Sequence, residues 1–290
     1  MAHSETVSNT QKNQAHYDQL YGKVNIEGIL RKLTHLDAFL NDATTTDTSW
    51  VCMYRDGFKD QLKGQTVLEL GCGDCTNAAV MAALGARVWA NDISTKSGAI
   101  VAALNQAYNF EYPITYLEGD FLELPLPDMK FDYVVGKAFV HHLTHEQEEA
   151  FLRKIVSLLK PTGKVRYVEP AVNSNWLDTL RWMVPVKGRP SSLQPSKFKA
   201  WKLADPHPDR DNSGKHYKKI GVRYFHEVAI TPIGSIERLH RLFPGASWNR
   251  KFRRWALQVE RFLPSSLSYM LARTQTIDYS ILKLNTNTTI

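Results

Sequence analysis

The chain has 290 residues, 43% of them hydrophobic and 22% charged, the composition of a globular protein large enough for one α/β domain with additions. No apolar run reaches the roughly 18 residues of a membrane-spanning helix. The first fourteen residues are polar, unlike a signal peptide, and three cysteines do not favour a disulfide framework. These features predict a cytoplasmic protein.

Residues 1–60 are predicted to form an N-terminal helical cap. One amphipathic helix carries Tyr17 and Tyr21, a second lies near Ile26–Leu40, and a third near Trp50–Leu62. Between the second and third, residues 41–48 are rich in Asn, Asp and Thr, which favours a polar break with capping residues.

Residues 66–74 (Thr-Val-Leu-Glu-Leu-Gly-Cys-Gly-Asp) are the most informative stretch of the chain. They predict a strand that ends in a glycine turn, and Thr76–Leu84 then predicts an alanine-rich helix. Backbone can approach a ligand closely at such a turn, and the N–H groups of a helix N-terminus attract anionic groups. A second strand, Arg87–Ala90, ends in Asn91-Asp92, where an acid is well placed to accept hydrogen bonds from ribose hydroxyls. The pattern indicates a nucleoside-containing cofactor.

The glycine turn also narrows the choice of cofactor. A dinucleotide fingerprint has a third glycine, where this chain has Thr76, and Asp74 would face a pyrophosphate unfavourably. A dinucleotide oxidoreductase is therefore a weaker interpretation. No Gly-Lys-Ser/Thr follows, so the turn is not a P-loop.

Five motifs in order, over roughly residues 61–170, resemble those of class I S-adenosylmethionine-dependent methyltransferases. They are Glu-Leu-Gly-Cys-Gly-Asp at 69–74, Val-Trp-Ala-Asn-Asp-Ile-Ser at 88–94, Tyr-Leu-Glu-Gly-Asp-Phe at 116–121, Phe-Asp-Tyr-Val-Val at 131–135 and Leu-Leu-Lys-Pro-Thr-Gly-Lys at 158–164. Three departures are visible. Cys75-Thr76 stands where a glycine or serine is usual, no Asn/Asp-Pro-Pro-aromatic tetrapeptide follows the fourth strand, and Lys137 replaces the small or polar residues expected near the cofactor. The last departure leaves the type of acceptor atom (O, N or C) open.

The resemblance implies an α/β, Rossmann-like fold with seven strands in the order 3-2-1-4-5-7-6, and S-adenosyl-L-methionine as cofactor. It implies that Asp92 binds the ribose, that Asp120 meets the adenine amino group and that Phe121 flanks the ring. In this family an N-terminal helix often folds over the cofactor, which would place Tyr17 and Tyr21 on the pocket. The remaining residues expected at the cofactor are Glu69, Gly71, Cys72, Gly73, Ile93 and Lys137.

Catalytic candidates follow from the loop that leaves the fourth strand. Thr144-His145-Glu146-Gln147 is a capping box that marks a helix running to Leu159, so residues 137–142 form this loop. The carboxyl ends of the strands make the ligand crevice of such sheets. His141, favoured over His142, is therefore predicted to take a proton from the acceptor. Glu169, at the end of the fifth strand, and His226 are predicted to support it.

Residues 171–220 are predicted to be a lid that selects the acceptor, and residues 221–290 to complete the core sheet. The lid begins with a helix, 175–184, that places Trp176, Leu180 and Met183 on one face, and continues as a polar segment from Lys197 to Tyr217. Strands are predicted at Gly221–Val228 and Thr276–Leu284, and helices at Ile233–Phe243 and Phe252–Leu271. No metal is predicted, because the Asp and His residues of 205–216 and the Cys72/Cys75 pair lack a recognised ligand spacing.

Charge is unevenly spread along the chain. Residues 1–170 hold 16 Lys/Arg and 21 Asp/Glu, whereas residues 171–290 hold 20 and 8, a net charge of −5 against +12. The basic part is read either as solvated helix faces or as the site of an anionic partner: a phosphorylated substrate, a membrane surface or RNA.

The sequence predicts a methyltransferase that acts on a small, largely apolar metabolite by in-line displacement, with peripheral membrane contact as one interpretation of its basic part. Nucleic acid is disfavoured because no RNA-binding module is appended. The alternatives are an RNA methyltransferase, and a protein that keeps the cofactor fold but serves as a cyclase or binding partner. The sequence leaves the oligomeric state open.

Overall fold

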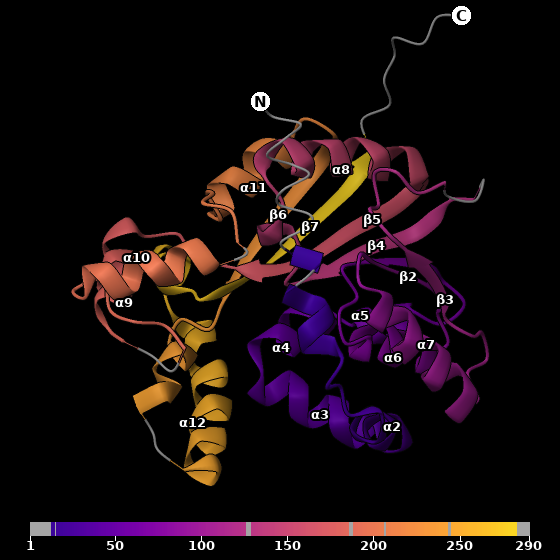
Figure 1. The fold of residues 1–290 in the computed structure, drawn as a ribbon, viewed down its shortest axis with the longest axis horizontal. Coiled ribbons are helices and arrows are strands. Elements are labelled where there is room, and N and C mark those ends of the chain that lie inside the picture. Colours follow the sequence, from indigo (N-terminus) through magenta and orange to yellow (C-terminus); the bar gives the residue numbers. More distant parts are fainter. Residues whose placement is uncertain are drawn as a thin grey trace, which may run out of the picture.

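A computed structural model describes residues 13–14, 16–125, 129–185, 188–205, 207–242 and 245–282. Seven strands form one sheet in the order β3-β2-β1-β4-β5-β7-β6, which confirms the predicted order (Figure 1). The strands are β1 (Thr66–Leu70), β2 (Arg87–Asp92), β3 (Thr115–Glu118), β4 (Phe131–Lys137), β5 (Leu159–Pro170), β6 (Phe225–Ile233) and β7 (Thr274–Leu282). All neighbouring pairs from β3 to β5 are parallel, and β7 runs antiparallel to both β5 and β6.

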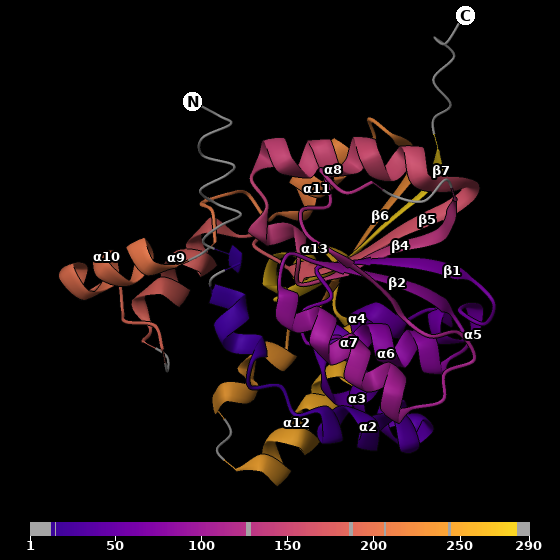
Figure 2. The ribbon, with the colours of Figure 1, turned by 45° about the vertical axis from the view of Figure 1, so that its right-hand side comes forward.

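Helices cover both faces of the sheet (Figures 1 and 2). One face carries α8 (His145–Leu158) and α11 (Gly214–Gly221); the other carries α4 (Thr48–Tyr54), α5 (Phe58–Gln61), α6 (Thr76–Ala83) and α7 (Thr95–Ala107). Successive side chains of β1 point to opposite faces of the sheet, so they pack in two hydrophobic cores. Val67 packs in the core on the α4–α7 side and Leu68 in the core on the α8 side. Because both faces are covered, all five residues of β1 are buried.

The remaining helices lie outside these two layers. They are α2 (Ile26–Thr34), α3 (Leu36–Thr46), α9 (Asn175–Met183), α10 (Pro195–Ala204), α12 (Ala246–Val259) and α13 (Ser265–Leu271), with 3-10 turns η1 (Val140–His142), η2 (Glu237–Leu242) and η3 (Glu260–Phe262). Before α2, residues 16–21 are also helical. In the described part of the chain, no helix is long and apolar enough to cross a membrane.

The N-terminal helices differ from the prediction at two points. The predicted second helix is divided at His35 into α2 and α3. The expected polar break at 41–48 is wrong for residues 41–46, because α3 continues to Thr46. There the hydroxyls of Thr44, Thr45 and Thr46 donate to the carbonyl oxygens of the preceding turn instead of ending the helix. The break comes at Asp47, whose side chain caps α4.

The C-terminal part was predicted less well. The segment from Lys197 to Tyr217, predicted to be a polar part of the lid, contains most of α10 and half of α11. Residues 233–242 do not form the predicted α-helix: Ile233 ends β6, and the 3-10 turn η2 begins at Glu237. Phe243, the last residue of that prediction, lies outside the described residues. The helix predicted for Phe252–Leu271 is interrupted at Leu263-Pro264, because proline cannot continue it. Residues 283–284 of the last predicted strand lie outside the described residues, as do residues 1–12 of the predicted cap.

Candidate active site

The turn after β1 is built from two glycines with left-handed backbone conformations. Gly71 has φ +64° and Gly73 has φ +55°. A Cβ at Gly71 would lie 2.3 Å from the Phe139 ring, and a Cβ at Gly73 would lie 2.8 Å from the hydroxyl oxygen of Tyr21. Both positions therefore require glycine, because any side chain would strain the backbone and collide with an aromatic residue.

Asp92, at the end of β2, is tied to this turn. Its Oδ2 accepts a hydrogen bond from the Gly73 N–H at 2.8 Å, and its Oδ1 accepts one from Ser94 at 3.0 Å. Burial raises the pKa of Asp92, and the backbone donors oppose that rise. The carboxylate is thus held beside the glycine turn, and its contact with a ribose stays a prediction.

A cavity of about 690 Å³ opens next to the turn. Its volume is in the usual range for ligand pockets. Of the residues predicted to bind the cofactor, those that line it are Tyr17, Tyr21, Gly71, Cys72, Gly73, Asp92, Ile93, Asp120, Phe121 and Lys137. The loop after β4 lines the same cavity with Phe139, His141 and His142.

Two tyrosines from the N-terminal helical segment cover the cavity. The rings of Tyr17 and Tyr21 stack at 5.3 Å, and the Tyr17 hydroxyl lies 3.2 Å from Nε2 of His142. Burial raises the pKa of Tyr17 to about 12, so its hydroxyl keeps its proton at neutral pH. The cap therefore supplies part of the wall of the cavity, from residues far away in the sequence.

His141 and Glu169 form a hydrogen-bonded pair at the ends of β4 and β5. Nδ1 of His141 lies 2.6 Å from Oε2 of Glu169, which is buried. The same carboxylate accepts hydrogen bonds from the backbone N–H groups of Phe139 (2.9 Å) and Val140 (2.7 Å). Glu169 thus fixes both the loop and the orientation of the His141 ring, one of the roles predicted for it.

His207, which belongs to the predicted lid, lies beside His141 and His142 and forms a cluster of three histidines with them. The His207 ring lies parallel to that of His141 at 5.1 Å and 4.4 Å from that of His142. One ring nitrogen from each of the three lies within 4.8 Å of the others, close enough to share a metal ion. Each ring is also hydrogen-bonded within the protein: His141 to Glu169, His142 to Tyr17 and His207 to Asp205. Burial, followed by the neighbouring histidines, lowers the pKa of His142 to about 2, so this ring is neutral.

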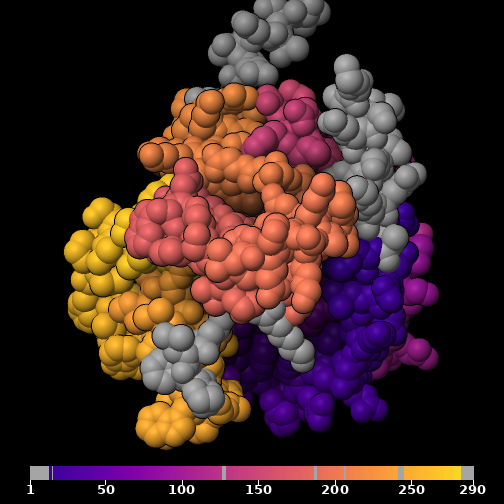
Figure 3. Space-filling view, turned by 60° about the vertical axis from the view of Figure 1, so that its left-hand side comes forward, coloured from indigo at the N-terminus to yellow at the C-terminus, as the bar shows by residue number. Residues whose placement is uncertain are grey.

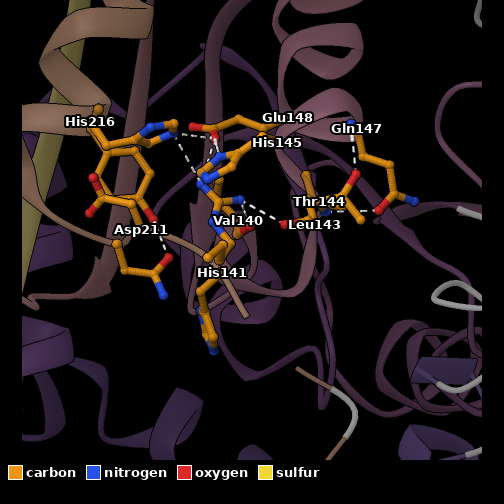
Figure 4. Close-up of polar contacts among 12 residues, drawn as sticks. Val140, His141, Leu143, Thr144, His145, Gln147, Glu148, Asp211 and His216 are labelled. Atoms are coloured by element: carbon orange, nitrogen blue, oxygen red, sulfur yellow. Dashed lines mark hydrogen bonds and ion pairs between the residues drawn. The ribbon is translucent and has the colours of Figure 1, made fainter. Parts of the chain in front are cut away.

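Arg210 clamps the turn that carries His141. It donates to the carbonyl oxygens of Val140 (2.9 Å) and Leu143 (2.8 Å), and it pairs with the buried carboxylate of Glu148. His216 Nε2 lies 2.7 Å from that carboxylate, and Figure 4 shows His216, Glu148 and the clamped turn side by side. Burial would raise the pKa of Glu148, but the contacts with His216 and Arg210 lower it overall.

Sequence reasoning missed Arg210 and did not place His207 at the site. Both follow α10 in a proline-containing segment with no periodic pattern, and both contact residues more than 60 positions earlier in the chain. The available signal is the Asp205-Pro206-His207 sequence close to Arg210, which as a sequence pattern bears only on metal ligation.

Two predicted site residues are corrected by the structure. His226 lies at the far end of the sheet, because Phe225 pairs with Leu282, whereas the cavity end of β6 is Ile233. Its side chain is exposed and lines a separate depression with Lys218 and Ser280. Glu69 does not line the cavity: it is buried behind the turn, where Oε1 accepts a hydrogen bond from Asn77 Nδ2 at 2.7 Å.

Comparison with known proteins identifies the family. A family model described as a methyltransferase domain matches residues 67–163. The cypemycin N-terminal methyltransferase of Streptomyces sp is 37% identical over 117 residues, which are 40% of this chain and 44% of that protein. The chain thus matches less than half the length of that relative. An uncharacterised methyltransferase of Mycobacterium bovis is 31% identical over 142 residues, which are 46% of this chain and 69% of that protein.

The fold comparison agrees. The cyclopropane synthase MmaA2 of Mycobacterium tuberculosis aligns with a TM-score of 0.50 and 11% identity, over 84% of this chain and 94% of that one. At this identity the similarity shows the fold alone. Together with the sheet order, the glycine turn and the sequence relatives, these findings show that the chain belongs to the class I S-adenosylmethionine-dependent methyltransferases.

Proposed function

We propose that this protein transfers the methyl group of S-adenosyl-L-methionine to a small, largely apolar metabolite by in-line displacement. One observation supports this proposal above all others. The same cavity is lined by the glycine turn, by Asp92 and by His141, whose ring Glu169 holds. A cofactor-binding element and a group that can accept a proton therefore face the same space.

The residues of the cavity fit this cofactor. Gly71 and Gly73 bring bare backbone to the wall of the cavity, because Phe139 and Tyr21 leave no room for a side chain at either position, and Asp92 presents a fixed carboxylate beside them. Asp120 and Phe121, which the family resemblance assigns to the adenine ring, line the same cavity. When bound, S-adenosylmethionine supplies a methyl group that its sulfonium makes electrophilic.

The acceptor side of the cavity favours an apolar molecule with one polar group. Phe139, Leu143 and Phe151 line it together with the histidines. The histidines are the polar groups that a hydroxyl or amine of the acceptor would meet. Holding the acceptor in the correct orientation can contribute roughly 7–11 kcal/mol to catalysis.

His141 is proposed as the proton acceptor and Glu169 as the residue that positions it. If the Nδ1–H of His141 donates to Glu169, Nε2 carries a lone pair and is the basic atom of the ring. A positioned base contributes about 10²–10⁴-fold when the acceptor must lose a proton. The carboxylate then stabilises the imidazolium formed by that transfer.

Calorimetric titration of S-adenosylhomocysteine tests the cofactor part of the proposal. Micromolar binding to the wild type, lost in Asp92→Ala, is expected, with NAD⁺ as the negative control. Acceptors are then screened with a labelled methyl donor, small apolar hydroxyl and amine compounds beside tRNA. No binding of S-adenosylhomocysteine, or methylation of the RNA alone, would contradict the proposal.

A further inference from the structure

Exposed apolar side chains are concentrated in one part of this molecule. Among the described residues, Leu20 is the only exposed large apolar side chain before residue 175. The tryptophan face, as we define it, consists of such residues on α9, α10, α12 and η3: Trp176, Leu180, Met183, Leu203, Trp248, Trp255 and Phe262. Figure 3 shows α9, α10 and the C-terminal helices on one side of the molecule. Apolar surface gathered in this way marks an interaction site.

The exposed residues of α9 are not needed to hold the lid together. Trp182 packs against Phe198 and Trp201 of α10, with ring centroids 5.4 and 5.7 Å away. The stripe on the other residues of α9 is separate from this cluster: Trp176 is 56% exposed, and it shares its face with Leu180 and Met183 at helical spacing. The lid therefore has a small core of its own and a second apolar stripe that faces solvent.

Helix α12 repeats this arrangement. Trp248 is 71% exposed and Trp255 is 52% exposed, and Lys251 lies between them on the same helical face, its Nζ 5.7 Å from the Trp248 ring. The arginines of the opposite face pair with acids of the same chain, Arg250 with Asp42 and Arg253 with Glu237. The helix thus packs on its arginine side and presents tryptophan and lysine outward.

The charge of these helices is of one sign. Helices α10 and α12 together contain seven Lys and Arg residues and no Asp or Glu. Lys197, Lys199 and Lys202 are exposed on α10, and Lys251 and Arg261 are exposed near the tryptophans of the C-terminal part. Tryptophan beside lysine and arginine, on a helix without acids, is typical of segments that lie in the interface of an anionic bilayer.

We propose that the tryptophan face binds the surface of an anionic lipid bilayer. The apolar side chains enter the headgroup region, and the exposed lysines meet the lipid phosphates. Helix α10 ends three residues before His207, which lines the cavity, so the same segment connects the bilayer to the candidate active site. The role of this contact rests on the proposed function: it would supply an apolar acceptor directly from the membrane.

Vesicle sedimentation tests the proposal with the full chain. The wild type is expected to bind vesicles of equal parts phosphatidylcholine and phosphatidylglycerol, to bind pure phosphatidylcholine at least tenfold more weakly, and to be released by salt. Each lysine near an anionic surface contributes roughly fivefold, so K197Q/K199Q/K202Q should weaken binding about 100-fold. Trp248→Ala with Trp255→Ala should weaken it about tenfold or more.

The matched control is R31Q/K63Q/K164Q, which removes the same charge from exposed positions outside the tryptophan face. It should bind vesicles within threefold of the wild type. Equal binding to neutral vesicles, equal loss in the control, or no vesicle binding would overturn the proposal. So would tryptophan-dependent dimerisation without vesicle binding, which would assign the face to a second copy of the chain.

Titration of S-adenosylhomocysteine into each variant separates the two proposals. Intact cofactor binding without vesicle binding would refute the membrane contact alone. Vesicle binding without cofactor binding would refute the proposed function alone.

Discussion

The carboxylate of Glu169 is the most informative atom group to alter, and Glu169→Gln is the smallest change that removes it. Oε1 accepts the N–H groups of Phe139 and Val140, and the amide oxygen of glutamine can keep both. Oε2 accepts the backbone N–H of His141 at 3.3 Å and faces its Nδ1 at 2.6 Å. In the variant an NH₂ group replaces this oxygen, so the His141 ring is expected to place its proton on Nε2.

Two effects of different size follow from this exchange. With Nε2 protonated, the ring cannot take a proton from the acceptor, and kcat should fall about 10²–10⁴-fold. The His141 backbone N–H loses its acceptor, and the free energy of unfolding should fall by about 1–3 kcal/mol. Binding of S-adenosylhomocysteine should stay within threefold, because Glu169 does not line the cavity.

The assay combines initial rates with a labelled methyl donor, calorimetry and urea unfolding. Glu260→Gln is the matched control: this buried carboxylate also accepts backbone N–H groups, from Gly234 at 2.8 Å and Ile236 at 3.2 Å, but lies outside the cavity. It should lose similar stability and keep its kcat. A kcat for Glu169→Gln within threefold of the wild type, or an equal loss in both variants, would refute the reasoning.

Four further predictions concern the residues of the site. Gly71→Ala should abolish measurable binding of S-adenosylhomocysteine while Gly64→Ala, also at positive φ but with open space around it, should not; calorimetry compares them. Arg210→Met leaves Glu148 buried with a partner removed, and should cost about 3–5 kcal/mol of unfolding free energy in urea. Because the pKa of His142 is lowered in the folded protein, the unfolded chain binds more protons in acid, and the free energy of unfolding falls as the pH drops below about 6.5. Between pH 7 and pH 5 the wild type should lose about 2 kcal/mol more unfolding free energy than His142→Asn. Equal losses in the two proteins would contradict this prediction. Dialysis against EDTA should leave methyl transfer unchanged, because each histidine of the cluster has a partner within the protein.

Much of the cofactor half could be predicted because its signals are local. The glycine turn, the acid at the end of β2 and the capping box of α8 each depend on residues within a few positions of one another. Backbone strain at Gly71 and helix capping at Thr144 are decided within one turn of chain. The glycine turn, the acid at the end of β2 and the capping box therefore lie in the structure where these local patterns predict them.

The predictions were wrong where tertiary contacts outweighed the local preference of the residues or where a local pattern could not give a long-range pairing. The Thr and Asp residues at 42–46 favour a break, yet Leu40 and Ala43 are buried against the core and the helix continues. His226 has the alternation of a core strand, but periodicity does not say which end of a strand meets the ligand crevice. That depends on the direction of β6 against β7, a long-range pairing.

The sequence by itself determined the family, the sheet order carried with it, and the residues around the cofactor turn, because these follow from short motifs in a fixed order. Only the tertiary structure decided that Glu169 and not His226 contacts His141, that His207 and Arg210 reach the loop after β4, and that the tryptophans of α9 and α12 face solvent. These contacts join residues that lie from 28 to 70 positions apart, or depend on which face of a helix finds a partner. Such choices are made by packing of the whole chain, which no local pattern encodes.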